Sequence, residues 1–402
     1  MVNSYSFTII IDNQDYTPLT QGLTNVEIYS SIYTLYPYAI MRIALSDQQI
    51  EEGILTIGKN WRLGVSHVIT SETKFYDLAV WKYETTTKNI FNNTLNKDYI
   101  VYFIHPFFFK QKLYSFAYYG STDIVAHSAL LKNNLIDFFD DIFITKSYNS
   151  ESRYFQLQET FGSFLEKRLM GNYLGDGPTY CFVDWNNKFS ITTYNDCLKA
   201  SSACLASNEI KPVYATQSDI QTHRDNHKFL SIFDIKFSFN SSGTLWHRLK
   251  AGTTYIQPFN TVVDKRTLNR KNVSTVEDPS NYYPVFYDEK EINKKEFLFT
   301  YIDDSLRDMP SILATFYDKH KYTIEDQKLI ICSMPGLASQ IGNPIIIDVP
   351  KNFFYSVPEA SDFTTKYIIS EIKLFYTKTQ LLQYTSCIKD GLPTASFGNT
   401  FK

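Results

Sequence analysis

The C-terminal part of the chain most constrains the fold, because it predicts three strands and no catalytic motif. An apolar strand over residues 343–349 ends at Pro350, whose ring lacks a backbone N–H. Two longer strands follow, Lys366–Thr377 and Gln380–Ile388, and the second stops at the turn-forming run Lys389-Asp390-Gly391. The stretch carries no nucleophile, metal cluster or phosphate loop. It therefore predicts an architectural role.

The composition predicts a folded chain with a large share of strand. The 402 residues are 44% hydrophobic and 20% charged, enough for two or three domains with a sizeable core. The aromatic fraction is 16%, with 30 Tyr and 31 Phe. Aromatic residues favour strands, and Tyr favours interfaces because its ring is apolar and its tip polar. An AT-rich genome, whose codons favour Phe and Tyr, is an equal alternative explanation.

Charge and cysteine content exclude several classes of protein. A net charge of -3 argues against a protein that binds nucleic acid by neutralising phosphates, although not against a surface that DNA slides past. The five cysteines form no CxxC pair, so we expect neither a zinc site nor a disulfide framework. The N-terminus has no basic region and does not resemble a signal peptide. The longest apolar run, 100–109, is too short to span a bilayer, so we expect no membrane anchor.

The first part of the chain alternates short apolar runs with turn residues, which is typical of a barrel or sandwich. The predicted strands are Ser6–Ile11, Val26–Tyr33, Ala39–Leu45, Ile54–Ile57, Trp61–Ser66, Phe75–Tyr83, Ile100–Phe107 and Leu113–Tyr119.

The middle of the chain predicts a small α+β unit. Helical spacing occurs over 128–143 and 156–170, and a hairpin follows with strands Tyr180–Val183 and Lys188–Thr192. Further elements are predicted downstream: strands Phe229–Phe239, Leu245–Ile256 and Phe297–Ile302, a long polar arm over 264–296 and a helix over 309–319. The predicted division is residues 1–125 for a first β domain, 126–212 for the α+β domain, 213–327 for strands with the arm and helix, and 328–402 for a second β unit.

No motif predicts an active site. Residues 53–59 match GxxxxGK, but Asn60 stands where a phosphate loop needs Ser or Thr, and a strand ending in a glycine turn is the better interpretation. His223 and His227 have the spacing of metal ligands on a helix, yet no third ligand is evident. His105 lies in an apolar run and is expected in a core or interface. We therefore predict no enzyme activity, no catalytic residue, no cofactor and no metal.

Two stretches together with the C-terminal unit resemble a known family. The first is Glu159–Leu165, a predicted helix start, and the second is Gly177–Ser190, a hairpin with an aromatic-rich strand and a D-x-N turn. With the strand pattern G-x-x-I-x-I-x-V-P and the long strand YIISEIKLFY, they are similar to the central baseplate hub proteins of tailed phages, which are related to the base of type VI secretion spikes.

The resemblance implies a mainly β fold with an α+β insertion, in which two tube-type antiparallel β-barrel domains flank a small mixed domain. Three chains would present six similar domains, so that a homotrimeric ring matches a sixfold tail tube. The implied partners are a second and third copy, the tail tube protein, a spike or tail-tip protein and the tape-measure protein, with viral DNA only in transit. The protein would be made in the host cytoplasm and reside in the virion baseplate. Since nothing after Gly391 resembles a lysozyme or spike segment, any cutting of the cell wall would belong to a partner.

The residues expected at interfaces between copies are apolar residues of the C-terminal strand and the hairpin: Ile368, Ile372, Leu374, Tyr376, Phe182 and Trp185.

Two other functions stay open on the sequence alone. A glycan-binding or adhesion protein of the tail tip would stack sugars on exposed Trp185 or Trp246. A tail-associated hydrolase would need a pocket with converging carboxylates or histidines.

Overall fold

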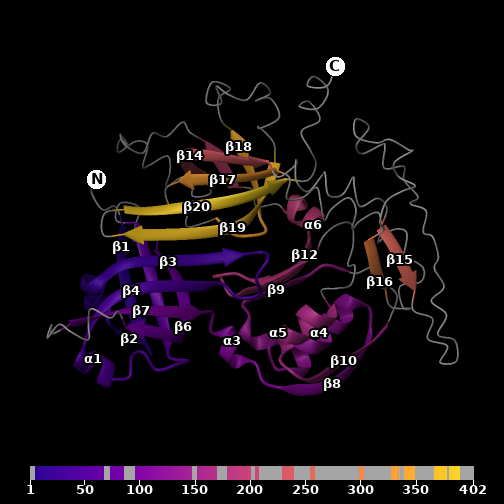
Figure 1. Ribbon diagram of the computed structural model, residues 1–402, viewed down its shortest axis with the longest axis horizontal. Helices are drawn as coiled ribbons and strands as arrows, with labels where there is room; N and C mark the ends of the chain where they lie inside the picture. The colour runs from indigo at the N-terminus through magenta and orange to yellow at the C-terminus, as the bar shows by residue number, and fades with distance from the viewer. Residues whose placement is uncertain are drawn as a thin grey trace.

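A single long β-sheet dominates the computed structural model (Figure 1). Thirteen strands follow one another in the order β18-β13-β14-β17-β20-β19-β3-β4-β7-β6-β5-β1-β2. The structure describes residues 5–67, 73–85, 96–146, 152–169, 179–200, 204–207, 229–239, 254–258, 298–302, 327–333, 335, 339–348, 366–377 and 380–389.

The N-terminal half of the sheet confirms most of the predicted strands. Its elements are β1 (Tyr5–Ile11), β2 (Gln14–Asp15), η1 (Thr17–Gly22), β3 (Leu23–Ser31), β4 (Tyr38–Ser46), α1 (Asp47–Glu51), β5 (Asn60–His67), β6 (Thr73–Thr85) and β7 (Asn96–Ile104).

The strand predicted over 54–57 is wrong, because two glycines bend this segment into turns. Gly53 and Gly58 adopt φ angles of 73° and 81°, a region that favours glycine. The Trp61 indole N–H donates to the Ile54 carbonyl at 2.9 Å and holds the turn against the core. Within the described part of this segment no helix follows Lys59, so the GxxxxGK match lacks the helix N-terminus of a phosphate loop.

The C-terminal half of the sheet contains the three strands predicted there. Its elements are β13 (Cys204–Ser207), β14 (Phe229–Phe239), β17 (Gln327–Ser333), β18 (Pro344–Asp348), β19 (Lys366–Thr377) and β20 (Gln380–Lys389). Since β18 pairs with both β13 and β19, these six strands form a closed circuit of pairings. The described N-terminal strands form no such circuit. A separate parallel pair joins β15 (Thr254–Pro258) to β16 (Leu298–Ile302).

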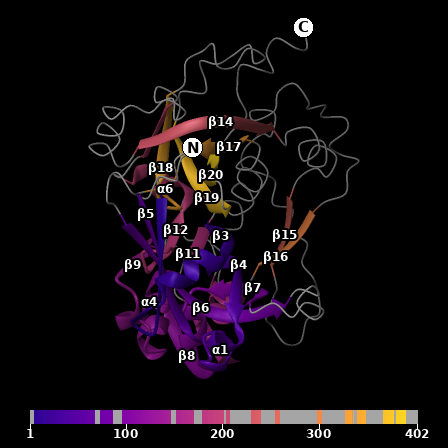
Figure 2. The same cartoon turned by 90° about the vertical axis from the view of Figure 1, so that its left-hand side faces the viewer.

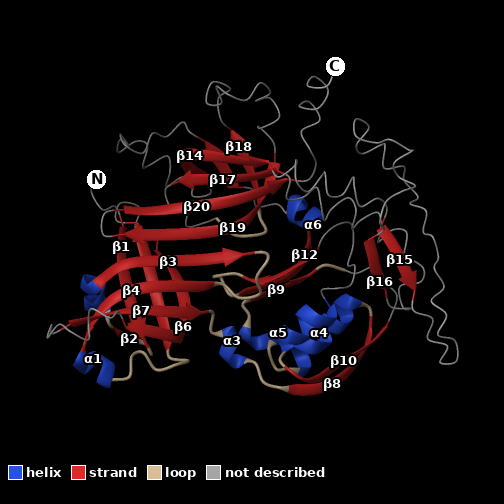
Figure 3. Ribbon diagram, in the orientation of Figure 1, coloured by secondary structure: helices blue, strands red, loops and turns tan. Residues whose placement is uncertain are grey.

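The α+β part lies beside one end of the N-terminal strands, where the helices gather (Figure 3). It comprises α3 (Phe107–Lys110), β8 (Tyr114–Gly120), α4 (Thr122–Lys132), η2 (Ile136–Phe138), β9 (Asp141–Ile144), β10 (Ser152–Glu159), α5 (Phe161–Phe164), the π-helix η3 (Leu165–Leu169), β11 (Thr179–Val183), β12 (Lys188–Thr193) and α6 (Tyr194–Lys199). β8 pairs with β10, and β12 pairs with both β11 and β9.

The predicted helices of this part need correction. The helix expected over 128–143 starts earlier and ends at Lys132, because Asn134 adopts φ 54°, a left-handed conformation that stops helices. The helix expected over 156–170 is preceded by a strand to Glu159. It begins only where the Thr160 hydroxyl accepts a hydrogen bond from the Ser163 N–H.

The hairpin of β11 and β12 is confirmed, and its turn is fixed by one carboxylate. Asp184 Oδ1 accepts hydrogen bonds from the backbone N–H groups of Asn186 at 2.8 Å and Lys188 at 3.0 Å. Burial raises the pKa of Asp184, while these backbone bonds act in the opposite direction. Asn187 closes the turn at φ 57°.

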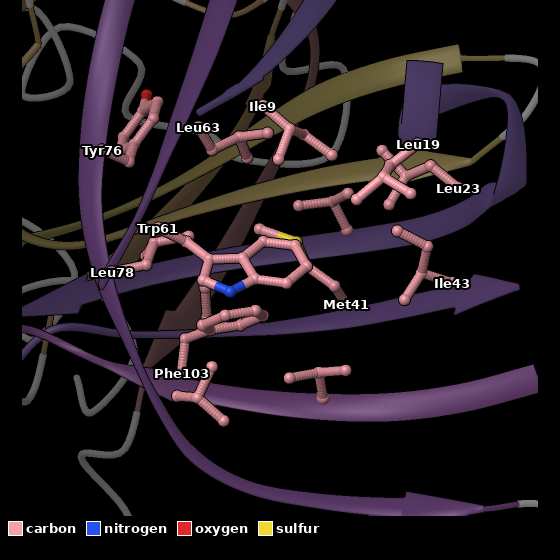
Figure 4. Close-up of a cluster of buried hydrophobic side chains, with 14 of the residues drawn as sticks. Ile9, Leu19, Leu23, Met41, Ile43, Trp61, Leu63, Tyr76, Leu78 and Phe103 are labelled. Carbon is pink, nitrogen blue, oxygen red and sulfur yellow. The ribbon is translucent and has the colours of Figure 1, made fainter. Parts of the chain in front are cut away.

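Strand β19 joins the two halves of the sheet. It pairs with β20 on one side and β3 on the other. Leu374 packs in the N-terminal core, which Figure 4 shows around Trp61, whereas Ile372 packs in the C-terminal core. Figure 2 shows the C-terminal strands stacked beyond the N-terminal ones along one direction of the molecule. Strand β19 therefore connects the two β-rich halves, because it pairs with strands of both halves and packs into both cores.

The mainly β fold with an α+β insertion is confirmed, and most pairings in the large sheet are antiparallel. Two separate tube-type barrels and the predicted domain boundaries stay predictions. The polar arm over 264–296, the helix over 309–319 and most of the strand predicted over 245–256 lie outside the described residues.

Candidate functional site

The candidate functional surface is one face of the sheet. We call the eight consecutive strands β14-β17-β20-β19-β3-β4-β7-β6 the central sheet. Every neighbouring pair among them is antiparallel. The first four come from the C-terminal half and the last four from the N-terminal half (Figure 1). Each half thus contributes the same number of strands to a continuous surface.

Alternation along β19 decides which side chains reach this surface. Ile372 and Leu374 point into the cores and are buried, while the residues that alternate with them, Glu371, Lys373 and Phe375, are half-buried on the other face. The strand therefore presents a mixed polar and aromatic outer face.

The six residues predicted at interfaces all pack within this chain. Ile368, Ile372 and Phe182 belong to the C-terminal core, and Leu374 and Trp185 to the N-terminal core. Tyr376 packs partly buried against the N-terminal core, with its ring 4.5 Å from that of Phe7. Their role at a contact between copies stays a prediction.

The outer face contains a network that the sequence predictions missed. The Tyr29 hydroxyl donates to Glu371 at 2.7 Å, and Lys373 pairs with Glu27 at 2.7 Å. The ring of Tyr29 lies 4.8 Å from that of Tyr38. These contacts join β19, β3 and β4 across the boundary between the two halves.

Ionisation on this face is also coupled across the boundary. Burial raises the pKa of Tyr29, and the hydrogen bond to the Glu371 carboxylate raises it further. The two charged residues of β19 on this face each have an oppositely charged partner, Lys328 for Glu371 and Glu27 for Lys373. The signal was present in the sequence: residues two apart in a strand share a face, and β19 reads Glu-x-Lys-x-Phe from residue 371.

The other candidate residues do not converge. His105 is buried beside Trp185 and Phe138, and burial lowers its pKa to about 4. Trp185 is buried, so its predicted use as an exposed sugar platform is wrong. The candidates that lie outside the described residues are His223, His227 and Trp246.

The described ranges hold no group of three His, Cys, Asp or Glu side chains arranged to bind a metal. In the same ranges, no helix combines the length and the hydropathy needed to cross a bilayer.

Comparison with known proteins gives matches at the level of structure. Neither models of protein families nor curated protein sequences match this chain. A tail protein from Neisseria meningitidis MC58 aligns over 96% of this chain and 97% of its own, with 7% identity and a TM-score of 0.55. The 43 kDa tail protein of prophage MuSo2 from Shewanella oneidensis aligns over 96% and 98%, with 10% identity and a TM-score of 0.55.

A third match is the E. coli c3393 protein, a component of the type VI secretion system described as structurally similar to the T4 bacteriophage tail proteins gp27 and gp5. It aligns over 96% of this chain and 78% of its own, with 10% identity and a TM-score of 0.49. The first two matches extend over nearly the whole of both chains, so they concern the complete arrangement of sheet and α+β part. The chain therefore has the fold of these two tail proteins.

Proposed function

We propose that the protein is a baseplate hub of a phage tail, and that three copies form a ring around the genome channel. The fold shared with two tail proteins over nearly their full lengths supports a structural role in a tail. The ring, its partners and its place in the virion are inferred from the architecture of the chain.

The observation that carries the proposal is the central sheet. Two halves of one chain each contribute four antiparallel strands to it, and β19 and β3 join them without a break. Three such chains present six similar four-stranded units, which is how a threefold ring can match a sixfold tube.

The chemistry of the outer face fits a wall rather than a reaction site. The charged side chains of β19 on this face form ion pairs, Lys373 with Glu27 and Glu371 with Lys328. The chain as a whole has a net charge of -3, and a protein without a surplus of positive charge does not hold passing phosphates strongly. We infer that this face lines the channel, with DNA as a transient passenger.

On this proposal, one rim of the ring binds the tail tube protein and the other a spike or tail-tip protein, and the tape-measure protein lies in the channel. The hub itself performs no covalent chemistry. Its role is mechanical. It keeps the threefold ring aligned with the sixfold tail tube, and it transmits the signal that opens the channel.

The test is the mass of the purified chain in solution. Light scattering coupled to size exclusion should give three times the 46.7 kDa chain mass, and negative-stain images should show a ring with a central hole. A monomer up to the highest soluble concentration, with no ring in the images, would contradict the proposal.

A further inference from the structure

We propose that a groove between the N-terminal strands and the α+β part binds a neutral saccharide. The groove has a volume of about 410 Å³, which lies within the range of ligand sites in proteins. Its walls come from β1, β5 and β6 on one side and from the segments around His105, Phe138 and Asn187 on the other. The inference goes beyond the hub function and does not depend on the ring.

Two tight turns and the start of a strand bring the polar side chains of the groove together. The turn between β1 and β2 carries Asp12 and Asn13 at φ angles of 47° and 66°. The hairpin turn of β11 and β12 carries Asn187 at 57°. Asn60 begins β5, and its carbonyl accepts a hydrogen bond from the Asp12 N–H at 3.3 Å. Asp and Asn tolerate this left-handed conformation, so the turns place amides and a carboxylate at one site.

Ion pairs hold the charged side chains of the groove in place. The Arg62 guanidinium donates to both carboxylate oxygens of Asp77, at 2.6 and 3.3 Å. The Lys59 ammonium lies 2.5 Å from the Asp12 carboxylate. A guanidinium has more N–H donors, and a carboxylate more acceptor sites, than one such pair uses, so both keep capacity for a ligand. Among the described lining residues the carboxylates of Asp12 and Asp77 are balanced by Arg62 and Lys110, which favours a neutral ligand.

The wall on the side of the α+β part is aromatic. The rings of His105 and Phe138 meet edge to face, with centroids 6.2 Å apart. Burial lowers the pKa of His105 to about 4, so this ring is uncharged at neutral pH. The Asn187 side-chain N–H donates to the Phe138 carbonyl at 2.6 Å and fixes this wall. An aromatic surface beside hydrogen-bonding groups fits a sugar ring, which has apolar C–H groups and polar hydroxyls.

Other classes of ligand fit the groove less well. An anion would meet the carboxylates of Asp12 and Asp77. An extended peptide is held by an open strand edge, whereas β1 pairs with β2 and β5, and β5 pairs with β1 and β6. A sugar hydroxyl both donates and accepts hydrogen bonds, and the groove offers amides, carboxylates and a guanidinium together. We therefore favour a saccharide.

Titration of the full-length chain with two neutral sugars tests the site. The probes are maltotriose, which carries hydroxyl groups only, and triacetylchitotriose, which also carries N-acetyl groups. Calorimetry measures the Kd, and saturation-transfer NMR detects contact with the sugar rings. We expect at least one probe to bind with a Kd of about 1 mM or tighter.

Two single variants locate the binding in the groove. Arg62→Ala removes a charged donor and should weaken binding about tenfold, and Asn60→Ala removes a neutral amide and should weaken it about fivefold. Both side chains are exposed, so we expect the variants to keep the circular dichroism spectrum of wild type. The matched control is Arg42→Ala, an exposed arginine of β4 that does not line the groove, and it should bind like wild type.

The possible outcomes separate the proposal from its alternatives. Binding of neither probe at about 10 mM, ten times the expected Kd, would overturn the saccharide site. Wild-type affinity in both groove variants would also overturn it, because the sugar would then bind elsewhere. Tighter binding of the anionic sugar sialyllactose than of both neutral probes would contradict the neutral ligand.

Discussion

Strand β19 makes a sharp prediction, because it belongs to the C-terminal half and yet packs Leu374 into the N-terminal core. Leu374 is only 4% exposed and lies opposite Ile28 of β3. Truncation to Ala removes three buried carbons and leaves a cavity between strands held on both sides by ladders. Buried Leu→Ala changes cost about 2–5 kcal/mol. We expect about 3 kcal/mol here, because the flanking strands cannot collapse into the space.

Urea unfolding followed by tryptophan fluorescence measures this loss. Trp61 and Trp185 both lie in the core that Leu374 enters, so their emission reports on it. The matched control is Lys373→Ala, the preceding residue on the same strand, whose side chain lies on the outer face and pairs with Glu27. Both side chains of this pair remain in contact with solvent, and such surface ion pairs contribute about 0–1 kcal/mol, so the control should stay within that range.

A Leu374→Ala variant within about 0.5 kcal/mol of wild type would refute the reasoning, since surface substitutions have effects of that size. Equal losses for the two variants would do the same. Either result would mean that β19 does not fasten the two halves through this core.

Three further variants test other parts of the structure. His105 is 2% exposed, and burial lowers its pKa from 6.5 to about 4 on folding. The unfolded chain therefore binds this proton more tightly than the folded chain does. The contribution of neutral His105 to the free energy of unfolding is complete above pH 6.5 and is lost as the pH falls toward 4. Unfolding titrations at pH 7 and pH 4 should show about 3 kcal/mol less pH-dependent loss for His105→Asn than for wild type. Gly22→Ala would place a Cβ 2.5 Å from the Ala44 carbonyl oxygen, a backbone atom of β4. The substitution should lower the unfolding free energy by about 1–3 kcal/mol. An unchanged urea midpoint would contradict this, because it would mean that the backbone of β4 moves away without cost. Ile372→Asp buries an unpaired carboxylate in the C-terminal core and should leave no soluble folded protein, as judged by circular dichroism; a folded variant would contradict the burial of this residue.

The positions of most strands could be predicted from alternation and turn residues. β19 was predicted with both of its ends correct, because its apolar positions alternate and Lys and Thr bound it. The segment over 54–57 misled because four apolar or β-branched residues in a row resemble a strand, while the flanking glycines at positive φ decide for turns. The helix predicted over 128–143 was too long for a similar reason, because Asn134 adopts a positive φ angle that ends the helix.

The functional surface was harder to predict, because an apolar side chain by itself predicts burial in the core of its own chain and not a place at an interface. Ile372 and Leu374 drew attention as interface residues, but alternation sends them into the cores of their own chain. The outward residues of the same strand are polar or aromatic, and their contacts with Tyr29 and Glu27 involve sequence separations of more than 300 residues. Only the pairing of β19 with β3 brings them together, and no local pattern encodes that pairing.

A three-dimensional reconstruction of the assembled protein by electron cryo-microscopy tests the central claim most directly. The account predicts three copies in a closed ring, with the central sheet as its wall and the face of Tyr29, Tyr38 and Lys373 toward the hole. A ring in which this face points outward, or an assembly in which the two halves of the chain do not share one wall, would contradict it.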